Sequence, residues 1–131
     1  MNTEKETIKF LDANVIINAF TVNKDANACM KLIRQPFFTD ALCLAEAHQS
    51  ISRISKSKDF ATGCIKALYI LEGKILSLDS NLLFECLKRA ERYNLSMFDL
   101  IHYVAALLNG CNEFVSYDHD FNNLEIPRTE P

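Results

Sequence analysis

Acidic residues stand directly after several short apolar runs of this sequence. Asp12 follows IKFL, Asp79 follows KILSL, and Asp118 follows EFVSY, with Asp120 two positions further on. In an open parallel sheet the functional groups gather beyond the carboxyl ends of the strands, so these side chains are candidates for one shared site. Carboxylates crowded into one pocket repel each other, and a divalent cation bound between them relieves that repulsion. The positions of the acids therefore indicate metal-dependent chemistry.

Two further acids lie in segments with helical periodicity. Asp99 belongs to MFDLIHYVAALLNG, which is apolar almost all round and typical of a buried helix, and it shares one stripe of that helix with His102 and Tyr103. A polar stripe on a buried helix must face polar partners. Glu46 is the only charged residue in the window ALCLAEAH and lies off the centre of the core face of its helix.

Each acid also has a purely structural explanation. Asp12 and Asp79 could cap the helices that follow them, and Asp118 and Asp120 could be turn residues in DHDFNN. Glu46 could simply face water. Asp99 stands three residues after Ser96, the spacing of a capping box, but this spacing does not explain the histidine and tyrosine beside it.

The elements that position these acids alternate along the chain. Four apolar runs have the length of strands, at residues 8–11, 36–39, 74–78 and 113–116. Segments with helical periodicity separate them, at about 14–23, 25–33, 40–55, 58–71, 81–93 and 97–109. This alternation predicts an α/β fold: three α/β/α layers with a mostly parallel central sheet. With only 3 Gly, 3 Pro and no repeat, residues 1–131 are expected to form a single domain.

Composition narrows the class of protein. The 131 residues are 49% hydrophobic and carry a formal net charge of -3, which argues against coating nucleic acid by charge alone. No apolar run approaches the roughly 18 residues of a membrane span, and MNTEKETIKF lacks a signal-peptide pattern, so we expect a cytoplasmic protein. The cysteines are spread singly without a CxxC motif, so we expect free thiols rather than disulfides or a zinc site. They are Cys29, Cys43, Cys64, Cys86 and Cys111.

Four acidic motifs occur in order along the chain: FLDANVII, LAEAHQSISR, LSMFDLIHYVAALLNG and EFVSYDHDF. Together they resemble the PIN domain family, most closely the small VapC-like toxin nucleases of toxin–antitoxin pairs, over nearly the whole chain. The resemblance implies a metal-dependent endoribonuclease that hydrolyses RNA phosphodiester bonds. It implies that Asp12, Glu46, Asp99 and Asp118 are the catalytic acids and bind divalent metal, with Asp120 as an auxiliary metal ligand.

Further residues follow from the same resemblance. Asn14 and Ser116 match polar positions near the family's acidic site, and we count them with His102 as auxiliary residues. The family also implies a cognate antitoxin protein and a homodimer. The sequence departs from the family by bulky residues near the third and fourth acids, namely His102, Tyr103, Tyr117 and His119.

The charges give this resemblance a physical reason. Four carboxylates converging at about 5 Å would repel by roughly 3 kcal/mol for each pair at an effective dielectric of about 20. Oxygen ligands without cysteine favour Mg²⁺ or Mn²⁺ over Zn²⁺, so Mg²⁺ (or Mn²⁺) is the expected cofactor. Such an ion can activate water against a phosphodiester, and the chain has no GxSxG, GxxxxGK[ST] or GxGxxG motif for other chemistry.

Positive charge for an RNA substrate must come from elsewhere in the chain. Arg53, Lys56 and Lys58 follow the helix that carries Glu46, which makes them the preferred RNA-binding candidates. A second basic group lies at residues 88–92. Either group could instead consist of ordinary solvated lysines and arginines with no role in RNA binding.

Three alternatives compete with a nuclease. A phosphoacceptor receiver domain could use Asp79, but Leu11 stands where a second acid should accompany Asp12, and the last strands offer no lysine. A catalytically silent PIN-like module could bind RNA without cutting it. A helical di-metal carboxylate protein built on Asp99 and His102 would need paired E-x-x-H units, which the sequence lacks.

Overall fold

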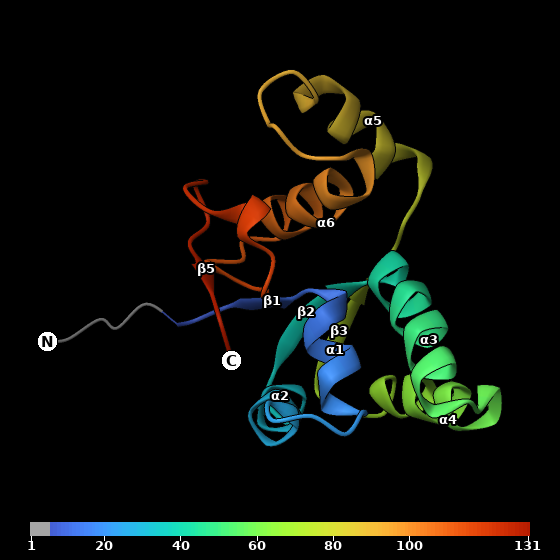
Figure 1. Ribbon diagram of the computed structural model, residues 1–131. Helices are drawn as coiled ribbons and strands as arrows, with labels where there is room; N and C mark the ends of the chain where they lie inside the picture. The colour runs from blue at the N-terminus through green and yellow to red at the C-terminus, as the bar shows by residue number, and fades with distance from the viewer. Residues whose placement is uncertain (1–5) are drawn as a thin grey trace, which may run out of the picture.

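The structure, a computed structural model, describes residues 6–131 (Figure 1). Its strands form one sheet in the order β3-β2-β1-β4-β5, and all neighbouring pairs are parallel. The strands are β1 (Lys9–Leu11), β2 (Phe37–Asp40), β3 (Gly73–Leu76), β4 (Glu113–Val115) and β5 (Arg128–Thr129). The α-helices are α1 (Ala13–Ala19), α2 (Ala26–Ile33), α3 (Ala41–Ser55), α4 (Lys58–Leu68), α5 (Ser80–Arg89) and α6 (Met97–Leu108), and a 3₁₀ helix η1 covers His119–Phe121.

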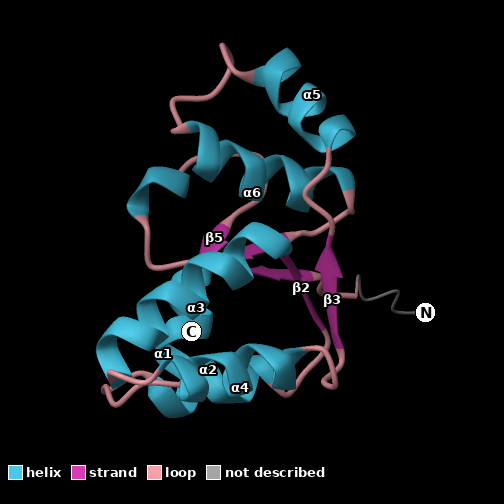
Figure 2. Cartoon of the chain, turned by 90° about the vertical axis from the view of Figure 1, so that its right-hand side faces the viewer, coloured by secondary structure: helices cyan, strands magenta, loops and turns pink. Residues whose placement is uncertain are grey.

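Helices cover both faces of the sheet. In Figure 2, α5 and α6 lie on one side of the strands and α1 to α4 on the other. This arrangement confirms the predicted three-layer α/β/α fold with a parallel central sheet.

The core is divided by the sheet into two apolar clusters. Phe10 and Phe114 belong to the cluster under α6, where their rings stack with centroids 5.0 Å apart. The next residues along the same strands, Leu11 and Val115, belong to the cluster under α1 to α4. Successive residues of a strand point to opposite faces, so the short central strands supply both clusters. Burial of each such side chain stabilises the fold by roughly 1.5–3 kcal/mol.

Several boundaries differ from those expected. α1 ends at Ala19 instead of near residue 23, because the Asn23 amide donates hydrogen bonds to the carbonyls of Asn18 and Thr21, both at 3.0 Å, and closes a turn. The sequence patterns also missed β5, because this strand has only 2 residues and no apolar run. In α5 the helix ends at Arg89, four residues before the expected end.

Two expectations from composition are also addressed by the structure. All five cysteines are free thiols and buried, as expected. Within residues 6–131, no helix is both long and apolar enough to cross a membrane.

Candidate functional site

Three acids, one from α6 and two from the segment after β4, meet beyond the carboxyl end of β4. Asp99 lies in the first turn of α6, Asp118 follows β4, and Asp120 lies in η1. One carboxylate oxygen of each lies within 4.8 Å of the other two. Local capping positions the acids: Ser96 caps α6 by accepting the Asp99 N–H at 3.3 Å, and Asp118 accepts the Asp120 N–H at 2.9 Å. We call Asp99, Asp118 and Asp120 the acidic cluster.

Asp12 is connected to this cluster by a serine hydroxyl. Asp12 directly follows β1, is only 7% exposed, and caps α1 by accepting the Ala13 N–H at 2.8 Å. Its other oxygen accepts the Ser116 hydroxyl at 2.7 Å, and Ser116 Oγ in turn accepts the Asp118 N–H at 3.0 Å. The Asn14 amide also donates to Ser116 Oγ, at 3.2 Å. The structure therefore brings Asp12, Asn14 and Ser116 together with the cluster.

Burial and mutual repulsion act on these carboxylates in the same direction. Burial raises the pKa of Asp12, against the lowering effects of the Ser116 hydrogen bond and the His102 charge, and Asp99 raises it further. The pKa of Asp99 is raised by burial first and then by the negative charge of Asp118. The ionised forms of both acids are therefore destabilised when no cation is bound, and a divalent ion would stabilise them.

Glu46 lies outside the acidic cluster in this structure. Its Oε1 is 2.7 Å from His102 Nε2, and its side chain is 43% exposed. The other ring nitrogen of His102, Nδ1, is 2.7 Å from Asp40 Oδ2 and 3.3 Å from Cys43 Sγ. The histidine is 1% exposed, so it is a buried imidazole between two carboxylates.

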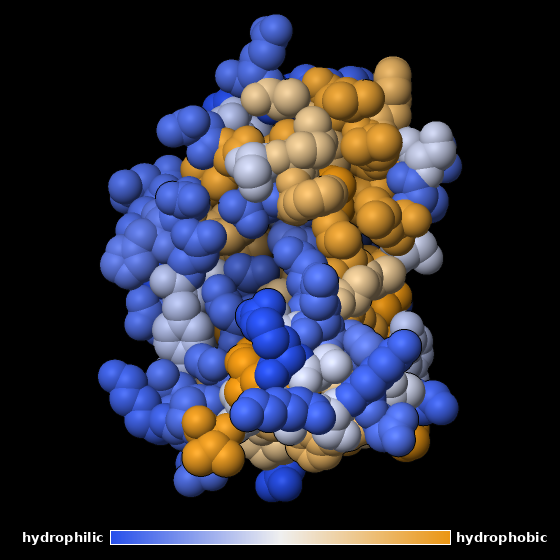
Figure 3. Space-filling model, turned by 45° about the vertical axis from the view of Figure 1, so that its right-hand side comes forward, coloured by the Kyte–Doolittle hydropathy of each residue, from blue (hydrophilic) through white to orange (hydrophobic). Residues whose placement is uncertain are grey.

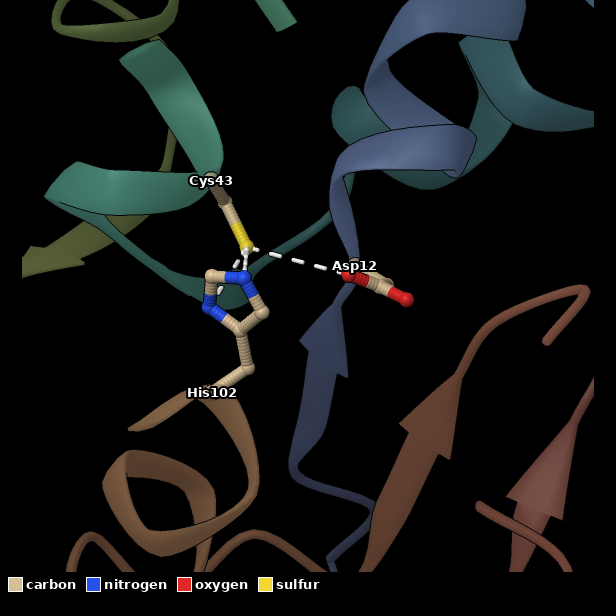
Figure 4. Close-up of side chains that lie close together, drawn as sticks. All are labelled: Asp12, Cys43 and His102. Carbon is tan, nitrogen blue, oxygen red and sulfur yellow. Dashed lines mark hydrogen bonds between the residues drawn. The ribbon is translucent and has the colours of Figure 1, made fainter. Parts of the chain in front are cut away.

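The protonation of this group follows from its contacts. Burial lowers the pKa of His102, but hydrogen bonds to Asp40, Cys43 and Glu46 outweigh burial and raise the pKa well above its usual range. Burial raises the pKa of Cys43 to about 12, so this residue is a thiol. The Cys43 Sγ–H points to Asp12 Oδ1 at 3.9 Å and connects the histidine to the first acid (Figure 4).

Asp12, Cys43 and His102 also offer three ligand atoms within 4.8 Å, of the kinds that zinc prefers. Both ring nitrogens already face carboxylates, however, and no buried side-chain nitrogen or oxygen among residues 6–131 lacks a hydrogen-bond partner. We interpret this group as a satisfied hydrogen-bond network. The donor set that fits a metal is the acidic cluster with Asp12, whose oxygens suit Mg²⁺ or Mn²⁺, bound directly or through water.

The remaining polar candidates lie further away. Arg53, Lys56 and Lys58 are exposed where α3 ends and α4 begins. Arg53 is seven residues beyond Glu46, about 10 Å along the helix axis. In the second basic group, Lys88 and Arg89 form ion pairs with Glu85, both at 2.8 Å.

Other residues take up structural roles that the sequence left open. Asp79 caps α5 by accepting the Leu82 N–H at 2.9 Å. Tyr103 donates to Glu125 at 3.0 Å, so its polar partner differs from the two carboxylates that face its stripe neighbour His102. The hydroxyl of Tyr117 lies 3.4 Å from Cys29 Sγ.

Sequence reasoning missed Asp40 and Cys43. Asp40 ends β2, is fully buried, and caps α3 by accepting the Cys43 N–H at 2.7 Å. A signal for Asp40 was present, because it directly follows the apolar run PFFT just as Asp12 follows IKFL. Nothing in the sequence distinguishes Cys43 from the other buried cysteines.

Comparisons with solved structures agree with this architecture. VapC20 of Mycobacterium tuberculosis, a sarcin-ricin loop cleaving toxin, superposes with a TM-score of 0.72 at 13% identity, over 90% of this chain and 98% of that chain. A toxin–antitoxin complex from Klebsiella pneumoniae gives a TM-score of 0.73 at 14% identity, over 92% and 96%. VapBC2 from Rickettsia felis, bound to a DNA fragment from its promoter, gives 0.68 at 15% identity, over 95% and 98%. At these identities the likeness concerns the fold.

Family membership comes from the sequence itself. No curated protein matches this sequence. The model of the PIN domain family, in contrast, matches residues 9–127. This range includes all four acidic motifs and the helices on both faces of the sheet. The chain therefore belongs to the PIN domain family.

Proposed function

We propose that this protein is a metal-dependent endoribonuclease that hydrolyses RNA phosphodiester bonds and serves as the toxin of a toxin–antitoxin pair. One observation carries the proposal: Asp99, Asp118 and Asp120 have carboxylate oxygens within 4.8 Å, and the Ser116 hydroxyl connects Asp12 to the same edge of the sheet. Membership of the PIN family and the fold shared with VapC20, a toxin named for cleaving the sarcin-ricin loop, support a nuclease.

Each acid has a role in the proposed site. Mg²⁺ or Mn²⁺, when bound, supplies a Lewis acid for the phosphodiester and lowers the pKa of the attacking water. Asp12, Asp99 and Asp118 would hold the ion, with Asp120 as an auxiliary ligand. Glu46 would orient water or help to hold the ion.

Other residues would hold Asp12 in place or bind the RNA substrate. Asn14 and Ser116 keep the Asp12 carboxylate in place through their hydrogen bonds. Arg53, Lys56 and Lys58 are exposed cations that would contact RNA phosphates beyond the site. The protein would act on RNA in the cytoplasm.

A protein partner is part of the same proposal. The solved neighbours include the toxin–antitoxin complex from Klebsiella pneumoniae, which supports a small antitoxin as the partner of this chain. Apolar side chains gather on the surface over α5 and α6 (Figure 3), where Phe84 is 60%, Leu87 54% and Phe98 63% exposed. Such a patch supports the expected homodimer, because large exposed aromatic groups are typical of interfaces.

The proposal is tested by cleavage of a broad set of structured RNAs with Mg²⁺ or Mn²⁺, with and without EDTA. Asp118→Asn removes one charge at constant side-chain size, and Asp59→Asn, at an exposed acid in the first turn of α4, is the matched control. We expect cleavage that EDTA and Asp118→Asn abolish and Asp59→Asn leaves intact. Cleavage that survives both EDTA and Asp118→Asn would refute the proposal. Metal binding without any cleavage would support the catalytically silent RNA-binding module instead.

A further inference from the structure

His102 occupies an unusual position, because each of its ring nitrogens faces a different carboxylate. Nδ1 lies 2.7 Å from Asp40 Oδ2, and Nε2 lies 2.7 Å from Glu46 Oε1. Carboxylates accept hydrogen bonds, so both ring nitrogens must donate, and the imidazole carries a proton on each. The histidine therefore joins a carboxylate of β2 to a carboxylate of α3.

The Asp40 end of this chain is rigid. Asp40 is fully buried, and its second oxygen accepts the Cys43 N–H at 2.7 Å as the N-cap of α3. The His102 ring is 1% exposed and packs near Phe10, with ring centroids 6.4 Å apart. Both ends of the Asp40 carboxylate are thus engaged, and it fixes the direction in which the Nε2–H of His102 points.

The Glu46 side chain, at the other end of this chain of hydrogen bonds, is flexible unless a partner holds it. A glutamate side chain has three rotatable bonds, and ordering it costs conformational entropy. Glu46 is 43% exposed, so its carboxylate reaches solvent while one oxygen is held by the histidine. His102 lies one helical turn after Asp99 in α6, so one helix supplies both an acid of the cluster and the group that holds Glu46.

We propose that His102 is a positioning residue, which Asp40 anchors at one ring nitrogen and which holds the Glu46 carboxylate at the rim of the acidic site with the other. This inference rests on the proposed function, in which Glu46 orients water or helps to hold the metal ion. His102 itself would not contact the ion, because both of its nitrogens are used. The Cys43 thiol, 3.3 Å from Nδ1 and 3.9 Å from Asp12 Oδ1, closes the network on the side of the first acid (Figure 4).

The first test needs neither RNA nor metal. In the ¹⁵N-labelled full chain, both ring N–H protons of His102 should give resonances that exchange slowly with water, and these should vanish in His102→Gln. Glu46→Gln should shift the Nε2–H resonance and leave the Nδ1–H resonance in place. A ring with only one protected N–H, or an Nε2–H that ignores Glu46→Gln, would overturn the proposal. Both outcomes are readable even if His102→Gln fails to fold, because Glu46→Gln keeps the buried histidine and Asp40.

The second test asks whether His102 acts through Glu46. Two properties are measured for each variant: the dissociation constant for Mn²⁺, by electron paramagnetic resonance, and kcat and KM for RNA cleavage. The variants are Glu46→Ala, His102→Gln and the double variant. Outer contacts of metal sites change affinity or activity by about 10–100-fold, so we expect a loss of this size in each single variant. The double variant should be no worse than Glu46→Ala alone. Losses that multiply would mean that the two residues act independently, and the proposal would fail.

A matched control is available on the same helix as Glu46. His48 lies in α3 and its Nε2 is 2.9 Å from the Thr62 hydroxyl, away from the acids. His48→Gln should leave Mn²⁺ affinity, kcat and KM unchanged. If the wild-type protein cuts no RNA, the proposed function fails, whereas the ring N–H resonances and the Mn²⁺ affinities still decide whether His102 holds Glu46.

Discussion

Replacing Asp99 with Asn should stabilise the metal-free protein and remove its stabilisation by Mg²⁺. One carboxylate oxygen of Asp99 lies within 4.8 Å of carboxylate oxygens of Asp118 and Asp120. The pKa of Asp99 is raised by burial and by the negative charge of Asp118. An amide has nearly the same shape as a carboxylate but no charge. The substitution therefore removes repulsion from the folded state and leaves the Ser96 cap, which binds the Asp99 backbone N–H, in place.

The size of the effect follows from the distances. Two unit charges at 4.8 Å repel by about 0.9 kcal/mol in water and by about 3.5 kcal/mol at an effective dielectric of about 20. Asp120 is exposed, so the lower figure is the better guide, and two neighbours give about 2 kcal/mol. Losing a negative charge in the first turn of α6 offsets roughly 0.3–1 kcal/mol of this gain. We expect a net increase of about 1 kcal/mol in the free energy of unfolding.

The assay is equilibrium unfolding by urea at neutral pH, with EDTA and with Mg²⁺. For the wild type, Mg²⁺ at about ten times its dissociation constant should add about 1.4 kcal/mol. Asp99→Asn should unfold at a higher urea concentration than the wild type in EDTA and gain little from Mg²⁺. Asp59→Asn, in the first turn of α4 and outside the site, should lose roughly 0.3–1 kcal/mol in both conditions and gain as much from Mg²⁺ as the wild type does.

The reasoning would be refuted by the opposite pattern. If Asp99→Asn lowers the free energy of unfolding in EDTA, the carboxylate makes a favourable structural contact that outweighs repulsion. If Mg²⁺ stabilises the wild type and Asp99→Asn equally, the ion binds elsewhere.

Three further predictions concern neighbouring parts of the molecule. Hydrogen bonds from Tyr93 and Tyr103 lower the pKa of Glu125, so the ionised Glu125 stabilises the folded protein at neutral pH and this contribution is lost as pH falls. Glu125→Gln should therefore unfold more easily than the wild type at neutral pH and match it in acid. Gly110 has a φ of 73°, so Gly110→Ala should cost about 1 kcal/mol in thermal unfolding, and Gly110→Asn less. Ser116→Ala should cost about 1–3 kcal/mol, measured with urea, because a buried carboxylate oxygen and a backbone N–H lose their shared hydroxyl.

The fold was largely predictable because its strands and helices have clear periodicities. The runs before Asp12 and Asp118 form β1 and β4, whose apolar residues alternate between the two core clusters. β5 was not predicted because Arg128 and Thr129 have no apolar pattern and pair through the backbone with β4. A strand of this kind depends on its neighbour rather than on its own sequence.

The site was predictable in part. The position of an acid after a strand can be read from the sequence, and Asp12 and Asp118 lie there in the structure. The partners of a buried polar side chain depend on how α6 packs against β2 and α3. The sequence therefore indicated a polar partner for His102 but could not identify Asp40 and Glu46 as that pair.

The most direct test of the account measures Mn²⁺ binding and RNA cleavage in the same samples of wild type and Asp12→Asn. Bound Mn²⁺ is followed by electron paramagnetic resonance, and cleavage by gel, as EDTA is titrated. The account predicts that cleavage by the wild type falls in parallel with bound Mn²⁺, and that Asp12→Asn, although folded, binds Mn²⁺ at least about ten times more weakly and does not cut. Cleavage that persists after Mn²⁺ is removed, or an Asp12→Asn protein that binds and cuts like the wild type, would contradict it.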